Sequence, residues 1–261
     1  MNRRSICLRF CALVALGTLS LLGNRCYSAE PENRVFEMRV YYAAEGKLDA
    51  LHARFRDHTT KLFEKHGITN IGYWVPIENP ERKLVYLLAY PNREAREASW
   101  KAFMSDSDWQ KAHKASEVDG KLVEKVDSKF FQATDYSPSI QLSTSGNRVF
   151  EMRTYTASPG NLSHLNSRFR DHTLKLFEKH GMTNIGYWNL MKDQEGSDNT
   201  LMYILSHPSQ ATAKDSFAAF GQDKAWSAAR TASEEKAGGS LTVKKGVQSV
   251  FMQATDYSPI R

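Results

Sequence analysis

The sequence predicts an α+β protein in which two tandem ferredoxin-like domains, each with the element order βαββαβ, pair face to face within one chain. The first observation behind this prediction is a duplication. Asn33–Arg39 recurs letter for letter at Asn147–Arg153, and Thr69–Trp74 recurs at Thr183–Trp188. The second is the hydrophobic pattern of each copy, which switches between the two-residue period of strands and the longer period of helices. Repeats of this length do not arise by chance, so the chain contains the same domain twice.

The elements of the first copy follow from these periods and from the turn residues between them. Alternating stretches rich in β-forming residues predict strands at 35–42, 68–77, 83–90 and 122–134. A helix begins at Gly46 and ends at Gly67, a residue that suits the left-handed position after a helix. A second helical region begins at Pro91 and breaks near Asp106. The second copy has insertions at 189–200 and near Gly238, in polar, turn-rich segments that indicate loops.

A four-stranded sheet with helices on one face leaves its other face bare. The predicted strands at 35–42 and 83–90 place apolar or aromatic side chains on both faces, and an exposed apolar sheet face needs a partner. Two copies in one chain supply that partner, because sheet can pack on sheet to make a barrel-like core. We therefore expect an intrachain pseudo-dimer. Pairing of sheets between chains, in a homo-oligomer, is the alternative.

Residues 1–29 have the features of a signal peptide, with Arg3 and Arg4 followed by an apolar stretch and by small residues up to Ala29. We expect cleavage, export to the periplasm or out of the cell, and no membrane span in the mature chain. An uncleaved anchor is the alternative. The arginine pair leaves both the general secretory and the twin-arginine route open. The rest of the chain divides into a first domain at 33–138, a linker at 139–146 and a second domain at 147–259.

The charge and the cysteine positions exclude several classes of function. The 261-residue chain has 41% hydrophobic and 25% charged residues, the balance of a soluble globular protein, and a formal net charge of +6. The leader contributes four arginines to that excess, and the rest of the chain carries 31 basic against 29 acidic side chains. Such a nearly neutral chain does not predict a nucleic-acid partner. All three cysteines lie in the leader, so no disulfide or cysteine ligand is expected in the mature protein.

Several short motifs resemble, in their order and spacing, the NIPSNAP domain. In the first copy they are Phe36–Tyr41, Leu62–Gly67, Gly72–Trp74 and Asp108–Trp109, and the second copy matches equally. The resemblance covers nearly all of the chain after the leader. It implies the dimeric α+β barrel fold, whose superfamily includes small monooxygenases, haem-degrading enzymes and members with no known activity. The resemblance therefore predicts the fold better than it predicts the function.

Two histidines are the candidate catalytic residues. His58 lies seven residues after Leu51 and four before Leu62, on the apolar stripe of the first predicted helix, and His172 is its counterpart in the second copy. We expect both to face the sheet, where a histidine can act as a general base, a ligand of haem iron or a proton donor. The alternative is a core histidine that is hydrogen-bonded locally.

Arginines and aromatic residues are the candidate ligand-binding residues. An arginine four residues before each histidine predicts an anion-binding corner or a rim charge. The tyrosine–tryptophan pair of the second strand should place one ring toward the helices and one toward the inter-sheet space, as a pocket for a flat ligand or as core. Glu37 and Arg39, and again Glu151 and Arg153, share a strand face, which predicts a polar site at the barrel mouth or a cross-strand pair. The candidates are Arg39, Arg54, Tyr73, Trp74, Arg153, Arg168, Tyr187 and Trp188.

No motif indicates a metal or an organic cofactor. The zinc-protease His-Glu-x-x-His pattern, phosphate-binding loops, dinucleotide glycine fingerprints and Gly-x-Ser-x-Gly elbows are missing, so no metal is expected and haem is the one cofactor left open. Three functions remain. The first is binding of a small apolar or aromatic molecule, or an accessory role, through the inter-sheet barrel. The second is a cofactor-poor monooxygenase-like or haem-binding enzyme that uses a pocket histidine, and the third is a structural scaffold. Whether the protein is an enzyme stays open.

Overall fold

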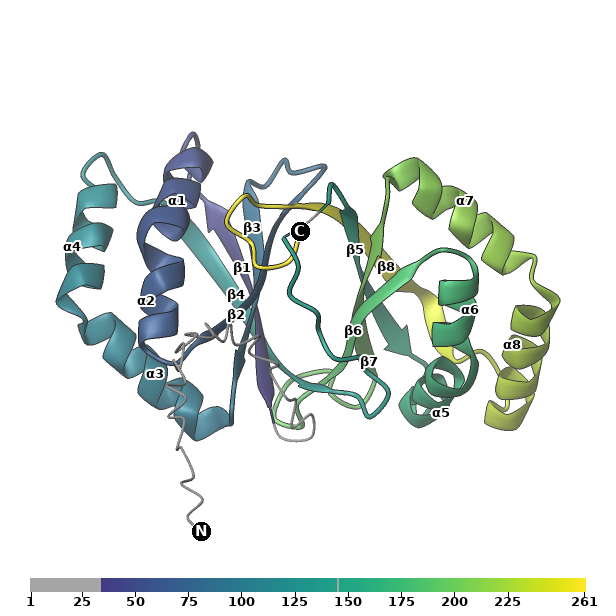
Figure 1. Cartoon of the computed structure of the whole chain (residues 1–261). Coiled ribbons are helices and arrows are strands. Elements are labelled where there is room, and N and C mark those ends of the chain that lie inside the picture. Colours follow the sequence, from purple (N-terminus) through teal and green to yellow (C-terminus); the bar gives the residue numbers. More distant parts are fainter. Residues whose placement is uncertain (1–33, 145) are drawn as a thin grey trace, which may run out of the picture.

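The computed structural model describes residues 34–144 and 146–261. The expected signal peptide at 1–29 lies outside these residues. Within the two described ranges, no helix is both long and apolar enough to cross a lipid bilayer. Each half has the predicted element order β-α-β-β-α-β, and the helices of the two halves lie at opposite ends of the molecule (Figure 1).

The first half follows the sequence prediction closely, with its strands beginning and ending within one or two residues of the expected positions. Its elements are β1 (Val35–Ala43), α1 (Leu48–Arg54), η1 (Phe55–Thr59), α2 (Thr60–Lys65), β2 (Thr69–Pro76), β3 (Lys83–Tyr90), α3 (Arg93–Ser105), α4 (Ser107–Ser116) and β4 (Val123–Ala133). The second helical region breaks at Asp106, as expected. The extended backbone of Asp106 ends α3, and its carboxylate accepts hydrogen bonds from the first N–H groups of α4.

The second half repeats this arrangement with some longer elements. They are β5 (Val149–Ala157), α5 (Leu162–Arg168), η2 (Phe169–Thr173), α6 (Leu174–Lys179), β6 (Thr183–Leu190), β7 (Thr200–His207), α7 (Gln210–Gly221), α8 (Lys224–Ala237) and β8 (Thr242–Ala254). Helix α8 has 14 residues where α4 has 10, and β8 has 13 where β4 has 11. The extra length at the end of α8 lies where the sequence places an insertion, near Gly238. The additional residues of β8 form a bulge inside this strand, where Lys245 has a φ of 61°.

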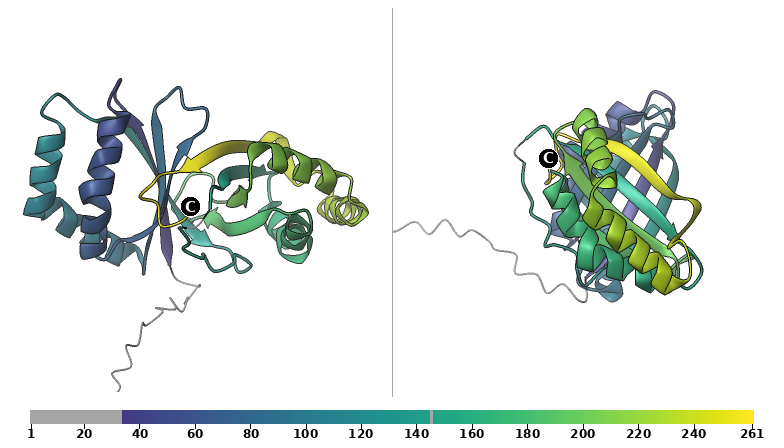
Figure 2. Two further views of the ribbon diagram at one scale, coloured as in Figure 1. Left: turned by 45° about the horizontal axis from the view of Figure 1, so that its top comes forward. Right: turned by 90° about the vertical axis from the view of Figure 1, so that its right-hand side faces the viewer.

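All eight strands form one closed barrel in the order β1-β3-β2-β8-β5-β7-β6-β4. Every neighbouring pair is antiparallel, and the two four-stranded sheets meet at two seams, β2 with β8 and β4 with β6. The expected intrachain pseudo-dimer is therefore confirmed. The barrel lies at the centre of the molecule, and each half covers the outer face of its own sheet with helices (Figures 1 and 2).

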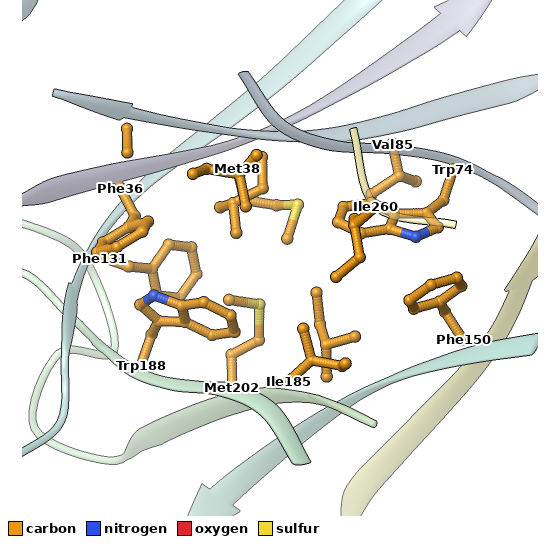
Figure 3. Close-up of a cluster of buried hydrophobic side chains, with 14 of the residues drawn as sticks. Phe36, Met38, Trp74, Val85, Phe131, Phe150, Ile185, Trp188, Met202 and Ile260 are labelled. Atoms are coloured by element: carbon orange, nitrogen blue, oxygen red, sulfur yellow. The ribbon is translucent and has the colours of Figure 1, made fainter. Parts of the chain in front are cut away.

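The barrel interior is a packed core. Aromatic and aliphatic side chains from both sheets meet there (Figure 3), among them Phe36, Trp74, Phe150, Trp188 and Ile260. Trp74 and Trp188 are 1% and 0% exposed. An eight-stranded barrel is just wide enough for its own side chains to fill it or to hold one small ligand. In this barrel the two apolar sheet faces fill the interior with each other's side chains, which is the core alternative for Trp74 and Trp188.

The helices of each half pack on the outer face of its sheet and make a second type of core. Tyr73 belongs to the core under the first-half helices, whereas its neighbour Trp74 points into the barrel. Tyr187 and Trp188 divide in the same way in the second half. The predicted alternation of these rings is confirmed, and all four are almost completely buried.

Each half sends the segment after its last strand across to the other half. The hydroxyl of Ser258 accepts a hydrogen bond from the backbone N–H of Tyr73, at 2.9 Å, and Ser137 does the same for Tyr187, at 2.9 Å. The C-terminal segment can be followed in Figure 1, in yellow, as it crosses from β8 toward the first half. These two reciprocal crossings explain why the motif Thr-Asp-Tyr-Ser-Pro ends both copies: each one fastens one half to the other.

A test of the barrel core uses the glycines beneath the two indoles. A Cβ atom at Gly72 would overlap the ring of Trp74 and approach Ile260 to 2.8 Å. We expect Gly72→Ala to lower the free energy of unfolding by about 1–3 kcal/mol, because overpacking forces neighbouring side chains to shift. The matched control is Gly221→Ala at the end of α7, where nothing lies within 4 Å. That variant should keep its stability or gain up to about 1 kcal/mol. Equal urea denaturation curves for the two variants would contradict this account of the core.

Candidate functional site

His58 and His172 do not face the sheet, contrary to the sequence prediction. Both are exposed, because the first helix of each half contains a π-helical turn, η1 or η2, that adds one residue to the helical repeat. The added residue rotates the following positions around the helix axis. Thr59 and Thr173 therefore take the buried places, and each hydroxyl donates a hydrogen bond at 3.1 Å to the carbonyl five residues earlier. A catalytic role for the two histidines stays a prediction.

A buried carboxylate lies between the sheet and the helices of the first half. Glu37 is 0% exposed and accepts hydrogen bonds from Arg39 and from Arg96 of α3, the latter at 2.9 and 3.0 Å. The hydroxyls of Tyr90 and Ser128 donate to the same carboxylate, at 3.0 and 2.7 Å. Burial alone would raise the pKa of Glu37, but the hydrogen bond from Arg96 and the charges of both arginines lower it to about 2.

The second half keeps this carboxylate with different partners. Glu151 is 1% exposed and contacts Arg153, His207 at 3.1 Å and the hydroxyl of Ser249. His207 occupies the position of the first-half tyrosine, and Ala213 stands where the second arginine would be. Burial favours a higher pKa for Glu151, but its hydrogen bonds with His207 and the charge of Arg153 outweigh it, so this pKa is also lowered.

Arg39 and Arg153 lie beneath helices rather than at the barrel mouth. The guanidinium of Arg39 is 4.4 Å from the ring of Trp100 in α3, and that of Arg153 is 4.5 Å from Phe217 in α7. The expected pairing with Glu37 and Glu151 is present, and of the two alternatives it is the plain pair on a strand face rather than a polar site at the barrel mouth. Strand alternation fixes the reason: Phe36 points into the barrel, so the residues on either side of it point to the helices.

A cavity of about 170 Å³ lies between the helices and the sheet of the second half. Its apolar wall is mostly aromatic, and charged and hydroxyl side chains make the rest of the lining. The lining residues are Tyr155, Arg168, Phe169, Thr173, Phe177, Phe220, Trp226, Arg230, Glu234, Ser240, Thr242 and Val247. The wide turn η2 supplies two of them, and the bulged strand β8 supplies two more. This aromatic cavity is our candidate functional site.

Arg168 is the charged group of the cavity wall. It is 7% exposed, and its Nε and Nη1 atoms are buried without a hydrogen-bond partner. The nearest carboxylate, that of Glu234, is 3.7 Å from Nη1 and closer to Arg230, at 3.2 Å. The ring of Trp226 lies 5.1 Å from the guanidinium. Burial lowers the pKa of Arg168, and the charge of Glu234, which acts in the opposite direction, offsets only part of this effect.

The corresponding arginine of the first half is hydrogen-bonded to side chains of the same half. Arg54 is 5% exposed and packs on Trp109, but its Nη1 donates to the carboxylate of Glu117 at 3.2 Å and to the hydroxyl of Ser116 at 3.3 Å. Only its Nε is left among the buried unpartnered atoms. In the first half the carboxylate is therefore within hydrogen-bond distance of the arginine, whereas in the second half it is 3.7 Å from the nearest guanidinium nitrogen.

The length of the last helix explains this difference. Helix α4 ends at Ser116, so Glu117 is its C-cap residue and turns toward both Arg54 and the backbone N–H of Leu122, at 3.3 Å. Helix α8 continues to Ala237, and Gly238 ends it with a φ of 74°. The matching Glu234 therefore stays on the helix and pairs with Arg230 one turn earlier.

A larger hollow of about 330 Å³ lies where the C-terminal segment meets α1. Two of its charged lining residues are paired with each other: Arg56 donates to both carboxylate oxygens of Asp256, at 2.6 and 2.8 Å. His52 contacts the hydroxyl of Tyr257 at 2.8 Å. The contacts at this place fasten the two halves together, so we do not assign it a ligand.

Sequence reasoning found only part of the candidate site. Among the eight ligand-binding candidates, Arg168 lines the cavity, and Arg153 reaches its edge through the hydroxyl of Tyr155 at 3.5 Å. The aromatic wall residue Trp226 and the carboxylate of Glu234 were missed as site residues. A comparison of the two copies could have pointed to these two residues, because both recur in each copy while the segment that follows them differs in length. In residues 34–144 and 146–261, no group of three or more histidine, aspartate or glutamate side chains is arranged to hold a metal ion.

The fold and this site define the class of protein: an α+β barrel made of two βαββαβ units in one chain. The sequence matches the family model NIPSNAP at residues 36–138 and again at 150–259, which is more than half of the chain. The chain therefore belongs to the NIPSNAP family. A comparison with curated protein sequences finds no match.

Solved structures that cover most of this chain share its fold. One is a proposed monooxygenase from Fusobacterium nucleatum, with a TM-score of 0.56 and 10% identity over 85% of this chain and 93% of that one. Another, from Lactobacillus acidophilus and also described as a proposed monooxygenase, has a TM-score of 0.55 and 10% identity over 87% and 98%. A NIPSNAP family protein from Agrobacterium tumefaciens is 22% identical over 41% of this chain and 98% of that one, with a TM-score of 0.37.

A prediction concerns the buried carboxylate of the first half. Because Glu37 neutralises buried arginines, Glu37→Gln should lower the free energy of unfolding at pH 7 by about 3–5 kcal/mol. A carboxyl whose pKa falls from 4.5 to about 2 on folding stabilises the fold above pH 4.5, and this contribution is lost as the pH falls toward 2. The gap between wild type and variant should therefore narrow over that window in chemical denaturation experiments.

The control for this prediction is Glu97→Gln. The carboxylate of Glu97 also contacts Arg96, at 3.2 Å, but its side chain is 64% exposed, so its removal should change stability by less than about 1 kcal/mol. A gap between Glu37→Gln and wild type that stays constant from pH 7 to pH 2 would refute the assigned role of the Glu37 charge.

Proposed function

We propose that this protein binds a small ring-bearing organic molecule in the aromatic cavity between the helices and the sheet of its second half. The observation that carries the proposal is the cavity itself, whose lining combines five aromatic side chains with charged and hydroxyl groups. Ligand sites in proteins commonly combine an apolar lining with a few placed polar groups. The proposal keeps the small aromatic ligand expected from the sequence and moves its site from the barrel to the second-half helices.

The size of the cavity limits the ligand. An apolar cavity of about 150 Å³ holds one benzene molecule, and the cavity here is about 170 Å³. It therefore fits one six-membered ring with a small substituent. The ring would lie among Phe169, Phe177 and Phe220, where offset or edge-to-face contacts between rings stabilise it.

The enzyme alternative draws on the structural relatives described as proposed monooxygenases, which share the fold at 10% identity. The cavity lining contains no histidine among the described residues, so a pocket histidine does not support the alternative at this site. Binding is therefore the function that this geometry favours. We also propose, from the sequence of residues 1–29 alone, that the chain is exported before it meets its ligand.

The binding proposal is tested with benzamide, a neutral single-ring probe, by following the indole N–H signals of the ¹⁵N-labelled full chain. We expect a saturable shift of the Trp226 signal, because this ring lines the cavity, and no shift of Trp109. Val247→Trp should abolish the shift, because Val247 lines the cavity and a larger ring there would fill it.

The matched control is Val126→Trp, at the equivalent position of the first half. Val126 and Val247 are similarly exposed, at 42% and 41%, so the two substitutions put comparable strain on the fold. Val126→Trp should leave the benzamide response unchanged. A response that survives in Val247→Trp, or one that is absent from the wild type at millimolar benzamide, would reject the site.

A further inference from the structure

The aromatic cavity contains one charged group whose hydrogen-bonding capacity the protein does not use. Arg168 is more than nine-tenths buried, and two of its guanidinium nitrogens have no acceptor. A buried ionic donor without a partner is unfavourable. The fold retains it although it places Glu234 only 3.7 Å away, beyond hydrogen-bond distance, and gives that carboxylate a nearer partner in Arg230.

The first half shows what this arginine accepts. Arg54 occupies the equivalent position, as the last residue of α1 and over the matching Trp109, and it donates a hydrogen bond to the carboxylate of Glu117 at 3.2 Å. Glu117 belongs to the protein, so the first half carries its own carboxylate. On the longer α8 the equivalent carboxylate, that of Glu234, lies 3.7 Å from Arg168, too far for a hydrogen bond, and the arginine lines a cavity.

We propose that the second-half cavity binds a single-ring carboxylate, with the ring among the aromatic side chains and the carboxylate on Arg168. This inference rests on the binding function proposed above and adds the charge and chemical class of the ligand. A planar guanidinium matches a carboxylate through paired hydrogen bonds, and the ligand's carboxylate supplies the acceptor that Glu117 supplies in the first half. One molecule binds per chain, because the first-half arginine is already occupied.

The donors left in the cavity wall place the charged end of the ligand. The guanidinium of Arg168 lies 5.1 Å from the ring of Trp226, and its Nε and Nη1 atoms have no hydrogen-bond partner, so they are the donors that a ligand can use. Ser240 and Thr242 also line the cavity. The charged end of the ligand therefore lies near Arg168 and Glu234, and the ring extends toward Phe220.

The test compares benzoate with benzamide, which has the same shape and no charge, by calorimetric titration of the full chain. Wild type should bind benzoate at least about tenfold more tightly than benzamide, with a stoichiometry of one. Arg168→Met should weaken benzoate binding about 10- to 100-fold, the usual loss for a hydrogen bond to a charged group, and leave benzamide binding nearly unchanged. Benzamide binding thereby reports that the variant is folded.

Two further variants make the result specific. Arg54→Met is the matched change in the first half and should leave the preference for benzoate intact. Glu234→Gln should strengthen benzoate binding about twofold to fivefold, because it removes a negative charge beside the bound carboxylate without emptying the site.

The outcomes distinguish the binding function from the narrower proposal that the ligand is a carboxylate. Equal affinities for benzoate and benzamide would overturn the carboxylate inference and leave the binding function standing. No binding of either probe would reject both. A phenyl phosphate that binds more tightly than benzoate and depends on Arg168 would overturn the carboxylate class, and a stoichiometry of two would overturn the assignment of the first-half arginine to Glu117.

Discussion

Each sheet of this chain has helices on only one face, and the apolar side chains of its other face have to be removed from water. The two sheets do this for each other, and the result is a closed barrel with Trp74 and Trp188 in its centre. Closure leaves no free sheet edge. It also fills the barrel with side chains from both sheets. The candidate binding site lies outside the barrel, between a sheet and its helices.

Duplication gives the chain two copies of that helix–sheet layer, and the two copies differ. In the first half, Glu37 is held by two arginines, and Arg54 is closed off by Glu117. In the second half, Glu151 has a single arginine and His207, and Arg168 lacks an equivalent partner. The first half is thus the more fully paired one, and the second half is the one with a cavity beside its arginine. A duplicated fold can diverge in this way because the shared barrel stabilises both halves together.

The buried charges explain why one fold can carry these two layers. A carboxylate such as Glu37 is stable under the helices only because arginines and hydroxyl groups satisfy it, and its lowered pKa expresses that balance. The same rule makes Arg168 notable, since it is as deeply buried as Arg54 but has fewer partners. The π-helical turns belong to this arrangement too, because they turn His172 outward and place Thr173 at the cavity wall.

The sequence by itself determined the duplication, the strand order, the pairing of the two sheets and the opposite directions of Tyr73 and Trp74, because these depend on periodicity and on the burial of apolar faces. The sequence analysis placed His58 on the wrong face of its helix, because a π-helical turn leaves no periodic pattern in a single sequence. It also placed the ligand pocket in the barrel, because hydrophobic periodicity does not show whether an enclosed space is filled by side chains. Only the tertiary structure decided that Glu117 reaches its arginine and Glu234 does not. The physical reason is that this contact depends on where a helix ends relative to a side chain more than sixty residues away.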